Sequence, residues 1–314
     1  MPSYTQKNGD FISKDFKLIP NNPIEEIVTV VPSRDMDCCG DFVWRVLADV
    51  DSTDEHKNDS NSFLFWFNQN STPTAKVYLV DVKDNANEID LTSNTDYGTP
   101  FNYGFEINEV QEKLVGYQIE WKKVIDTLGE GQYYIKCEIT DLFGITASTY
   151  SDVYCMKQYT LERANKTVKI EYYIKGILGD SNFDEKRRNY GTLNWYNSHR
   201  FDGFFMYENS EYVEEYVQYE NGQFDPIKLE QNPSYILQLR PIAKFKHDVL
   251  RNDIYMANER LITDYNVSNI EPYVQKKVKF TGAYDPNFYP MKSKLSSVTI
   301  KCTQEYNNLK KFRN

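Results

Sequence analysis

The sequence predicts a mainly β protein, built from two β-sandwich-like domains of which the second carries one amphipathic helix. Three observations indicate this. The chain has 314 residues, which at about 150 residues per domain suggests two domains. Short β-branched or alternating apolar runs, typical of strands, recur along most of it. The balance of acidic and basic residues also changes from one half to the other.

The first part of the chain predicts an arm followed by strands. Residues 1–24 are polar and are expected to form an extended arm, and residues 25–160 are expected to form the first domain. Two short helices are expected, one at 109–115 capped by Asn108 and one at 122–128 ended by Gly129. The strand-like runs are 27–31, 42–47, 63–67 and 76–82.

The end of this domain carries its most informative pattern. A helical turn leads into Gly131-Gln132-Tyr133 at the start of a strand, and a second strand follows at 145–154. This pattern resembles strands F and G of an immunoglobulin-like sandwich and implies that Tyr133 bonds back to upstream backbone. Ile135 stands where antibody domains have their second Cys, which excludes their inter-sheet disulfide. An unrelated β-hairpin is the alternative.

The second domain, residues 161–314, is expected to begin after a boundary at Thr160–Lys166. Asn221-Gly222 between two strand-like runs predicts a hairpin turn. An apolar stripe of Leu250, Ile254, Ala257 and Leu261 predicts a helix over about 246–262 that packs on its own sheet. The expected strands are 168–178, 200–207, 212–219, 224–229, 235–239 and 297–302.

Charge is distributed unevenly. Residues 1–160 carry 13 Lys and Arg against 26 Asp and Glu, and residues 161–314 carry 23 against 20, so the net charges are −13 and +3 and sum to −10. Head-to-tail docking of unlike halves is one interpretation, and a solvated acidic surface is the other. The acidic balance argues against sequence-specific nucleic-acid binding. Two basic clusters remain, Lys186–Arg188 and a C-terminal tail with Lys310, Lys311 and Arg313.

Cysteine usage and apolar runs bear on location. The five cysteines are unevenly spaced and include no CxxC pair, so we expect reduced thiols and no disulfide framework. The adjacent Cys38 and Cys39 are interpreted either as two reduced thiols or as a redox switch. No apolar run approaches the roughly 20 residues that span a bilayer, and the first ten residues contain no apolar signal segment. We therefore expect no membrane insertion and synthesis in a cytoplasm.

No residue constellation predicts catalysis, a cofactor or a metal. The three His are unclustered, and the nucleophile elbow, phosphate-binding loop and dinucleotide motif are missing from the sequence. Clustered carboxylates at Asp49–Glu55 suit a calcium ion, but Asp54 and Ser60 break the EF-hand pattern, which leaves a solvated loop as the default and ion binding open. The 25 Tyr and 18 Phe indicate first a core, second a subunit interface and third a glycan platform.

Three segments of the second half are similar to virion tail proteins of crAss-like bacteriophages. They read YYIKGILGD at 172–180, NYGTLNWY at 189–196 and RNDIYMANERLITDYN at 251–266. Within that group the chain most resembles the ring proteins stacked below the portal. The segments contain no defined signature motif.

The resemblance implies a non-enzymatic subunit of a ring of twelve or six copies in the phage neck or tail, assembled in the bacterial cytoplasm. Its neighbours would be the portal, other ring proteins and the distal tail barrel. We take Lys310, Lys311 and Arg313 as candidate interface residues. The alternatives are a carbohydrate-binding or host-recognition module of a phage tail, a glycan hydrolase and a non-viral adaptor.

Overall fold

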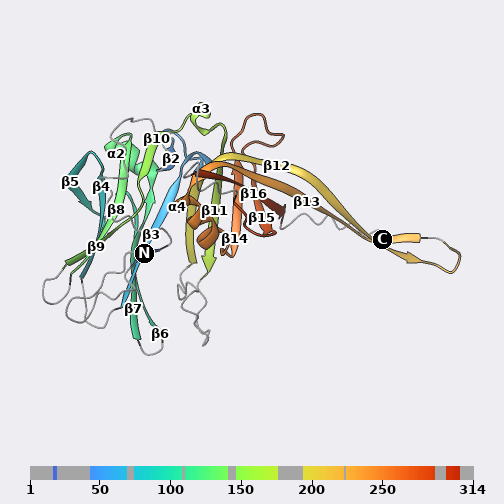
Figure 1. The fold of residues 1–314 in the computed structure, drawn as a ribbon, viewed down its shortest axis with the longest axis horizontal. Coiled ribbons are helices and arrows are strands. Elements are labelled where there is room, and N and C mark those ends of the chain that lie inside the picture. The colour runs from blue at the N-terminus through green and yellow to red at the C-terminus, as the bar shows by residue number, and fades with distance from the viewer. Residues whose placement is uncertain are drawn as a thin grey trace.

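The computed structural model describes residues 17–19, 43–68, 74–107, 110–140, 146–175, 194–222, 224–286 and 295–304, and it is mainly β (Figure 1). Strands predominate in both halves of the described chain, which confirms the predicted fold class at this coarse level. Helical segments are short and lie between strands.

The first half contains two groups of strands. One is a four-stranded antiparallel sheet in the order β1-β3-β7-β6. Its strands are β1 (Lys17–Ile19), β3 (Ser60–Asn68), β6 (Gly98–Ile107) and β7 (Val110–Glu120). The other has the order β2-β10-β8-β4-β5, with β9 also on β8, and its β2–β10 pair is parallel. Its strands are β2 (Trp44–Ala48), β4 (Thr74–Asp81), β5 (Asp84–Asp90), β8 (Gly131–Thr140), β9 (Thr146–Tyr150) and β10 (Tyr154–Gln158).

The second half is a six-stranded antiparallel sheet that closes on itself. Its order is β11-β14-β15-β16-β13-β12, and β12 pairs again with β11. The strands are β11 (Thr167–Lys175), β12 (Asn194–Gln218), β13 (Phe224–Ala243), β14 (Glu259–Asp264), β15 (Gln275–Thr281) and β16 (Leu295–Gln304). One register pair, Arg200↔Arg45, joins β12 to β2 and so connects the two halves.

Four short helical segments link these strands. They are the 3₁₀ turn η1 (Glu55–Lys57), α2 (Trp121–Leu128), α3 (Leu161–Ala164), and α4 (Lys244–Val249), which continues as the π-helical turn η2 (Leu250–Ile254). The predicted helix end at Gly129 is confirmed, because Gly129 follows α2 with the positive φ of 82° that glycine tolerates best. α3 lies at the expected boundary segment 160–166.

The core is continuous across the two halves. In strands such as β16, alternate residues point inward, as the two-residue period of a strand requires. Trp44, Ile135 and Tyr117 of the first half belong to the same buried cluster as Ile170 and Leu237 of the second. Because the halves share strand pairing and core packing, burial also stabilises the junction between them.

Three local expectations differ from the structure. Residues 109–115 were predicted helical, but Val110–Glu120 is strand β7, because Val115, Tyr117 and Ile119 alternate inward between β3 and β6. The helix predicted for about 246–262 ends at Ile254, because Glu259–Asp264 pairs with β11 as strand β14. Within the polar arm 1–24, the described residues Lys17–Ile19 form β1 against β3.

The cysteine expectation is wrong at one position. Cys137 and Cys302 are free and buried. Cys155 is disulfide-bonded, and its partner lies outside the described residues. Sequence spacing did not indicate this bond, because disulfide partners are set by spatial proximity and not by separation along the chain. The Cys38-Cys39 pair and strand 27–31 also lie outside the described residues.

Candidate functional site

The clearest candidate for a functional feature is a two-stranded ribbon that leaves the body (Figure 1). β13 pairs with β16 only from Ser234 to Ala243, whereas its pairing with β12 continues to Gln218↔Phe224. Among the described residues, no third strand pairs with 209–218 or 224–233. Each of these two strand segments has ten residues, which at about 3.3 Å per residue gives the two-stranded part a length of about 33 Å. We call residues 209–233 the ribbon.

The ribbon ends in the predicted turn. The N–H of Gly222 donates to the carbonyl of Tyr219 at 2.9 Å, and Gly222 has a φ of 80°. This confirms the hairpin signal at Asn221-Gly222, since a positive φ favours glycine. Tyr216 and Tyr219, near the tip, are 52% and 50% exposed. A two-stranded hairpin is marginally stable alone in water, so a partner surface would stabilise one of this length.

The ribbon differs in charge from the rest of its half. It contains six acidic residues and one basic residue, Lys228, so its net charge is 1 − 6 = −5. The remainder of residues 161–314 then carries 22 basic against 14 acidic residues, or +8. The acidic residues are Glu211, Glu214, Glu215, Glu220, Asp225 and Glu230. The second half therefore combines an acidic projection with a basic body, which the charge of the whole half conceals.

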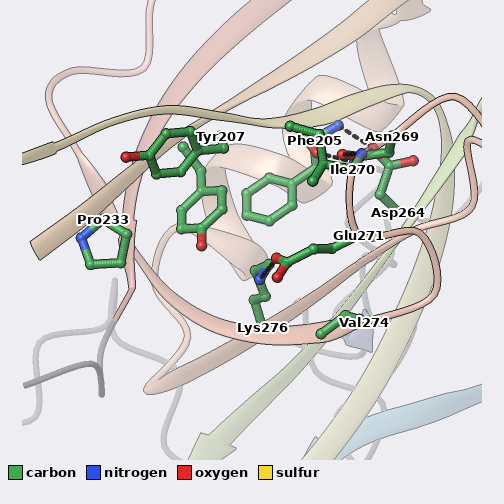
Figure 2. Close-up of a pocket in the computed structure, with 10 residues that line it drawn as sticks. Phe205, Tyr207, Pro233, Asp264, Asn269, Ile270, Glu271, Val274 and Lys276 are labelled. Atoms are coloured by element: carbon green, nitrogen blue, oxygen red, sulfur yellow. Dashed lines mark hydrogen bonds and ion pairs between the residues drawn. The ribbon is translucent and has the colours of Figure 1, made fainter. Parts of the chain in front are cut away.

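A pocket of about 270 Å³ lies at the base of the ribbon (Figure 2). The Asp264 carboxylate accepts from the N–H of Phe205 and from Asn269, both at 2.8 Å. The Asn269 amide also donates to the Phe205 carbonyl at 2.8 Å. These bonds hold the backbone of β12 where the ribbon begins. The Phe205 and Tyr235 rings stack beside them with centroids 5.0 Å apart.

The pocket itself has little room for a ligand. Its charged pair is internal, with Lys276 Nζ 2.5 Å from Glu271 Oε2. Its volume is below the 300–1,000 Å³ typical of small-molecule sites. Its rim is apolar and open, with Tyr207 50%, Val274 47% and Ile270 88% exposed. We interpret the residues that line this pocket as contacts that fix the base of the ribbon.

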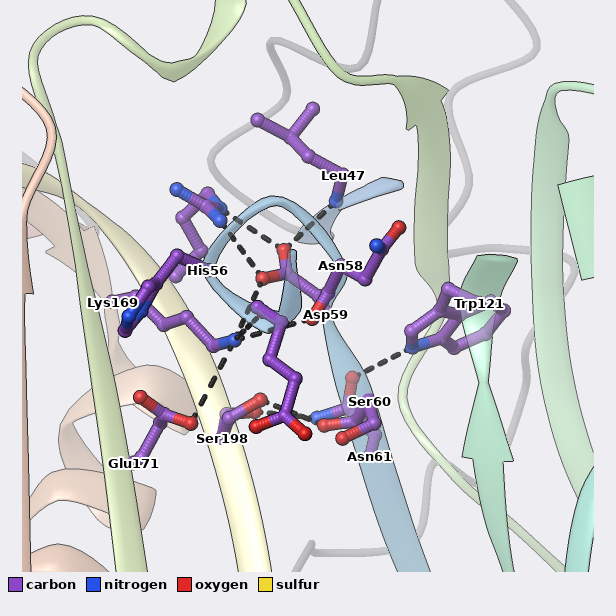
Figure 3. Close-up of polar contacts among 12 residues, drawn as sticks. Leu47, His56, Asn58, Asp59, Ser60, Asn61, Trp121, Lys169, Glu171 and Ser198 are labelled. Carbon is purple, nitrogen blue, oxygen red and sulfur yellow. Dashed lines mark hydrogen bonds and ion pairs between the residues drawn. The ribbon is translucent and has the colours of Figure 1, made fainter. Parts of the chain in front are cut away.

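A buried ion pair joins the two halves (Figure 3). Arg200 on β12 donates to Asp59 through Nε at 3.0 Å and Nη2 at 2.8 Å, and both side chains are almost fully buried. The Asp59 carboxylate also accepts from the N–H of Leu47 at 2.8 Å and lies 3.5 Å from Lys169 Nζ. Burial alone would raise the pKa of Asp59, but the charges of Arg200 and Lys169 lower it below its usual value.

An amide network continues this junction. The Trp121 indole N–H donates to Asn61 at 2.8 Å, and the Asn61 amide donates to Asn197 at 3.0 Å. Asn197 donates in turn to the Ser62 carbonyl at 3.2 Å. Asn197 and Arg200 lie on β12, the strand that continues into the ribbon. The first half therefore holds β12 in place before the strand enters the ribbon, because buried polar networks with satisfied hydrogen bonds specify one arrangement.

A cleft of about 580 Å³ opens beside this junction, between η1 and β11. Its aromatic lining is Tyr173 and Tyr196, whose rings are tilted by 52°. The Tyr196 hydroxyl donates to Glu171 at 2.8 Å, and Gln275 donates to the other oxygen of Glu171 at 2.6 Å. Tilted rings with an engaged hydroxyl do not offer the flat face on which a sugar stacks.

The buried titratable groups belong to the core. Asp152 accepts from the Trp44 indole at 3.1 Å, and burial raises the pKa of Asp152 to about 7. Burial lowers the pKa of His199 to about 3, and the His199 ring lies 4.1 Å from that of Trp44. His247 is within 2.6 Å of the Ser296 hydroxyl, but both side chains are 3% exposed or less. Their burial keeps this Ser–His contact away from a substrate.

The other sequence candidates fall into two classes. Lys310, Lys311, Arg313 and the Lys186–Arg188 cluster lie outside the described residues. In the Asp49–Glu55 loop, Asp54 accepts from the N–H of His56 and caps η1, and Asp49 lies 3.7 Å from Lys57 Nζ. Over the described residues, no group of three or more His, Cys, Asp and Glu side chains is placed to hold a metal ion.

In the comparisons with known proteins, no family model, curated protein or solved structure matches this chain. Within the part of the chain that the structure describes, no helix has both the length and the apolar character needed to span a membrane. Sequence reasoning missed the length of the ribbon, although alternation across 200–219 and 224–239 was the signal for it.

Proposed function

We propose that the protein is a structural subunit of a ring in the neck or tail of a bacteriophage, where it joins portal-proximal and distal tail components. Two observations support this proposal. The segments at 172–180, 189–196 and 251–266 resemble tail ring proteins of crAss-like phages. The ribbon projects about 33 Å beyond its last third-strand neighbour, a geometry suited to gripping another subunit. The resemblance supports the placement in a phage neck or tail, and the ribbon carries the role as a subunit that contacts another.

The proposal includes the architecture and the surroundings of the subunit. The first half is an immunoglobulin-like module and the second a β unit that packs on it through a shared core, with the boundary near residue 160. Tyr133 supports the first part, because its hydroxyl donates to the Gly129 carbonyl at 3.3 Å, as a corner tyrosine does. The subunit assembles in the host cytoplasm, forms a ring of twelve or six copies, and contacts the portal, other ring proteins and the distal barrel. It has no catalytic role.

A carbohydrate-binding role would need a platform of exposed, coplanar aromatic side chains. The described cleft offers Tyr173 and Tyr196 at 52° to each other, so the ring subunit is the function that the geometry favours.

The test is the oligomeric state of the full chain, measured by light scattering after size exclusion and by electron microscopy of the purified particle. A variant in which an Asn-Gly turn joins Ser210 to Pro233, a pair that faces across the ribbon, should lose self-association and fold normally. Leu161→Ser, which changes an exposed apolar side chain elsewhere, is the matched control. A chain that is monomeric both alone and in the particle would refute the proposal.

The basic tail is tested separately. Replacing Lys310, Lys311 and Arg313 by Glu should slow assembly and weaken its salt dependence if the tail docks on an acidic neighbour. Unchanged rate and salt dependence would remove the tail from the interface.

A further inference from the structure

One outward surface of the closed sheet combines positive charge with exposure. We call it the outer face, and it consists of Gln238 and Arg240 on β13, Thr299 and Lys301 on β16, and Lys279 on β15. All five side chains are exposed, while the alternate residues on these strands are buried in the core. Three of the five are basic. Lys301 lies 3.9 Å from Glu208, and the Lys301 side chain remains 69% exposed.

The outer face has an apolar border. Met206 on β12 is 43% exposed, and the half-buried Phe204 and Ile236 lie on the same side of the sheet by strand register. The Arg240 guanidinium lies 6.0 Å from the centre of the Phe204 ring. A partner could therefore combine acidic side chains with aromatic or aliphatic ones, the mixture typical of an interface core and rim.

The same side of the sheet already binds an acidic group where the first half covers it. Lys169 on β11 and Arg200 on β12 point to the side shared by Phe204 and Met206, since strand residues two apart share a face. Both contact Asp59 of the first half. The covered part thus shows basic side chains receiving an acidic residue, and the outer face carries exposed side chains of the same charge on the same side of the sheet.

We infer that the outer face of one copy receives the ribbon of a second copy. Charge complementarity identifies this occupant, because the ribbon carries −5 and the outer face three basic residues. The ribbon cannot fold back onto the outer face of its own chain, since it runs outward from the same strands and Asp264 and Asn269 hold its base (Figure 1). The contact is therefore between copies, and head-to-tail, as a ring requires.

Two features favour packing on a face over addition of a strand to an edge. Pro226 and Pro233 remove two N–H donors from β13 within the ribbon, which disfavours further backbone pairing along that strand. Tyr216 and Tyr219 are half exposed near the tip and can pack on Phe204, Met206 and Ile236. Charge then sets orientation and encounter rate, while the aromatic contacts supply most of the affinity.

The inference rests on the proposed function and is tested by exchanging charges. The face variant is Arg240→Glu, Lys279→Glu and Lys301→Glu, and the ribbon variant is Glu214→Lys, Glu215→Lys and Glu220→Lys. Sedimentation velocity of full chains measures self-association. Each variant alone should weaken it by at least about tenfold, and mixing the two should restore association between them. The control for the face variant replaces the exposed Lys76, Lys83 and Lys166 by Glu, which changes the net charge as much as the face variant does and should have no effect.

Restored association in the mixture also shows that both variants are folded. An unchanged wild-type level in the face variant would overturn the inference and leave the ring function standing. Loss in each variant without restoration in the mixture would overturn the pairing of these two surfaces. A wild-type chain that does not self-associate also overturns the pairing; if that chain forms a ring in the particle, the proposed function survives.

Discussion

The strongest single prediction concerns Asp59→Asn, which removes the negative charge from the junction between the halves. Asp59 is 3% exposed, and its carboxylate accepts two bonds from Arg200 and one from the Leu47 N–H. The amide keeps the shape of the side chain but leaves the Arg200 guanidinium buried without its counter-charge. Removing one partner of a buried ion pair typically costs about 3–5 kcal/mol, so we expect a loss of that size in the free energy of unfolding.

The assay is urea unfolding at neutral pH, followed by tryptophan fluorescence, because Trp121 bonds to Asn61 in the same junction. The matched control is Glu120→Gln. Glu120 also forms an ion pair, with Lys123 at 3.0 Å, but the two side chains are 44% and 42% exposed. Exposed pairs contribute about 0–1 kcal/mol, so the control should change stability by less than that.

A second variant separates the loss of charge from the loss of shape. Asp59→Leu combined with Arg200→Met removes both charges of the bidentate pair, and apolar replacement of such a pair is often neutral or stabilising. Lys169, which lies 3.5 Å from Asp59, keeps Glu171 at 3.7 Å as a counter-charge. We therefore expect the double variant to be more stable than Asp59→Asn. The reasoning is refuted if Asp59→Asn costs no more than Glu120→Gln, or if the double variant is no more stable than the single one.

Three further predictions test the core. Between about pH 4 and 6.5 two buried groups oppose each other: His199, with a pKa of about 3, takes up a proton on unfolding and lowers stability by up to about 1.4 kcal/mol per pH unit as pH drops, whereas Asp152, with a pKa of about 7, releases one and raises it. His199→Phe should therefore make stability rise relative to wild type as pH drops through this range, and a variant with the wild-type slope would exclude this role of His199. Tyr133→Phe should cost about 1 kcal/mol, since it removes the bond to Gly129, whereas Tyr219→Phe at the exposed tip should cost nothing measurable in thermal unfolding. Gly203→Ala should destabilise by about 1–3 kcal/mol, because a Cβ there would lie 2.5 Å from the Gln238 carbonyl oxygen, and a melting temperature equal to that of the exposed control Thr299→Ala would contradict it.

Local sequence signals predicted the positions of strands and turns better than they predicted which strands pair with each other. The alternation of Lys76–Val82 gave strand β4, Gly129 gave the end of α2, and Asn221-Gly222 gave the ribbon turn. These signals succeed because side-chain period and positive φ are properties of a few neighbouring residues. The same reasoning failed for Val110–Val115, where pairing with β3 and β6 overrides a helix-like cap and glycine.

The sequence by itself determined that this is a mainly β protein, where most of its strands lie, and that the chain reverses direction at Asn221-Gly222. Only the tertiary structure decided that 194–218 is one strand, that β12 pairs back with β11 to close the second sheet, and that Asp59 meets Arg200 across 141 residues of chain. The physical reason is that periodicity reports which side of a strand is apolar, whereas the neighbour on that side is chosen by packing between distant segments. The outer face follows from the same fact, because its basic residues come from three strands, β13, β15 and β16, that lie side by side only in the folded sheet.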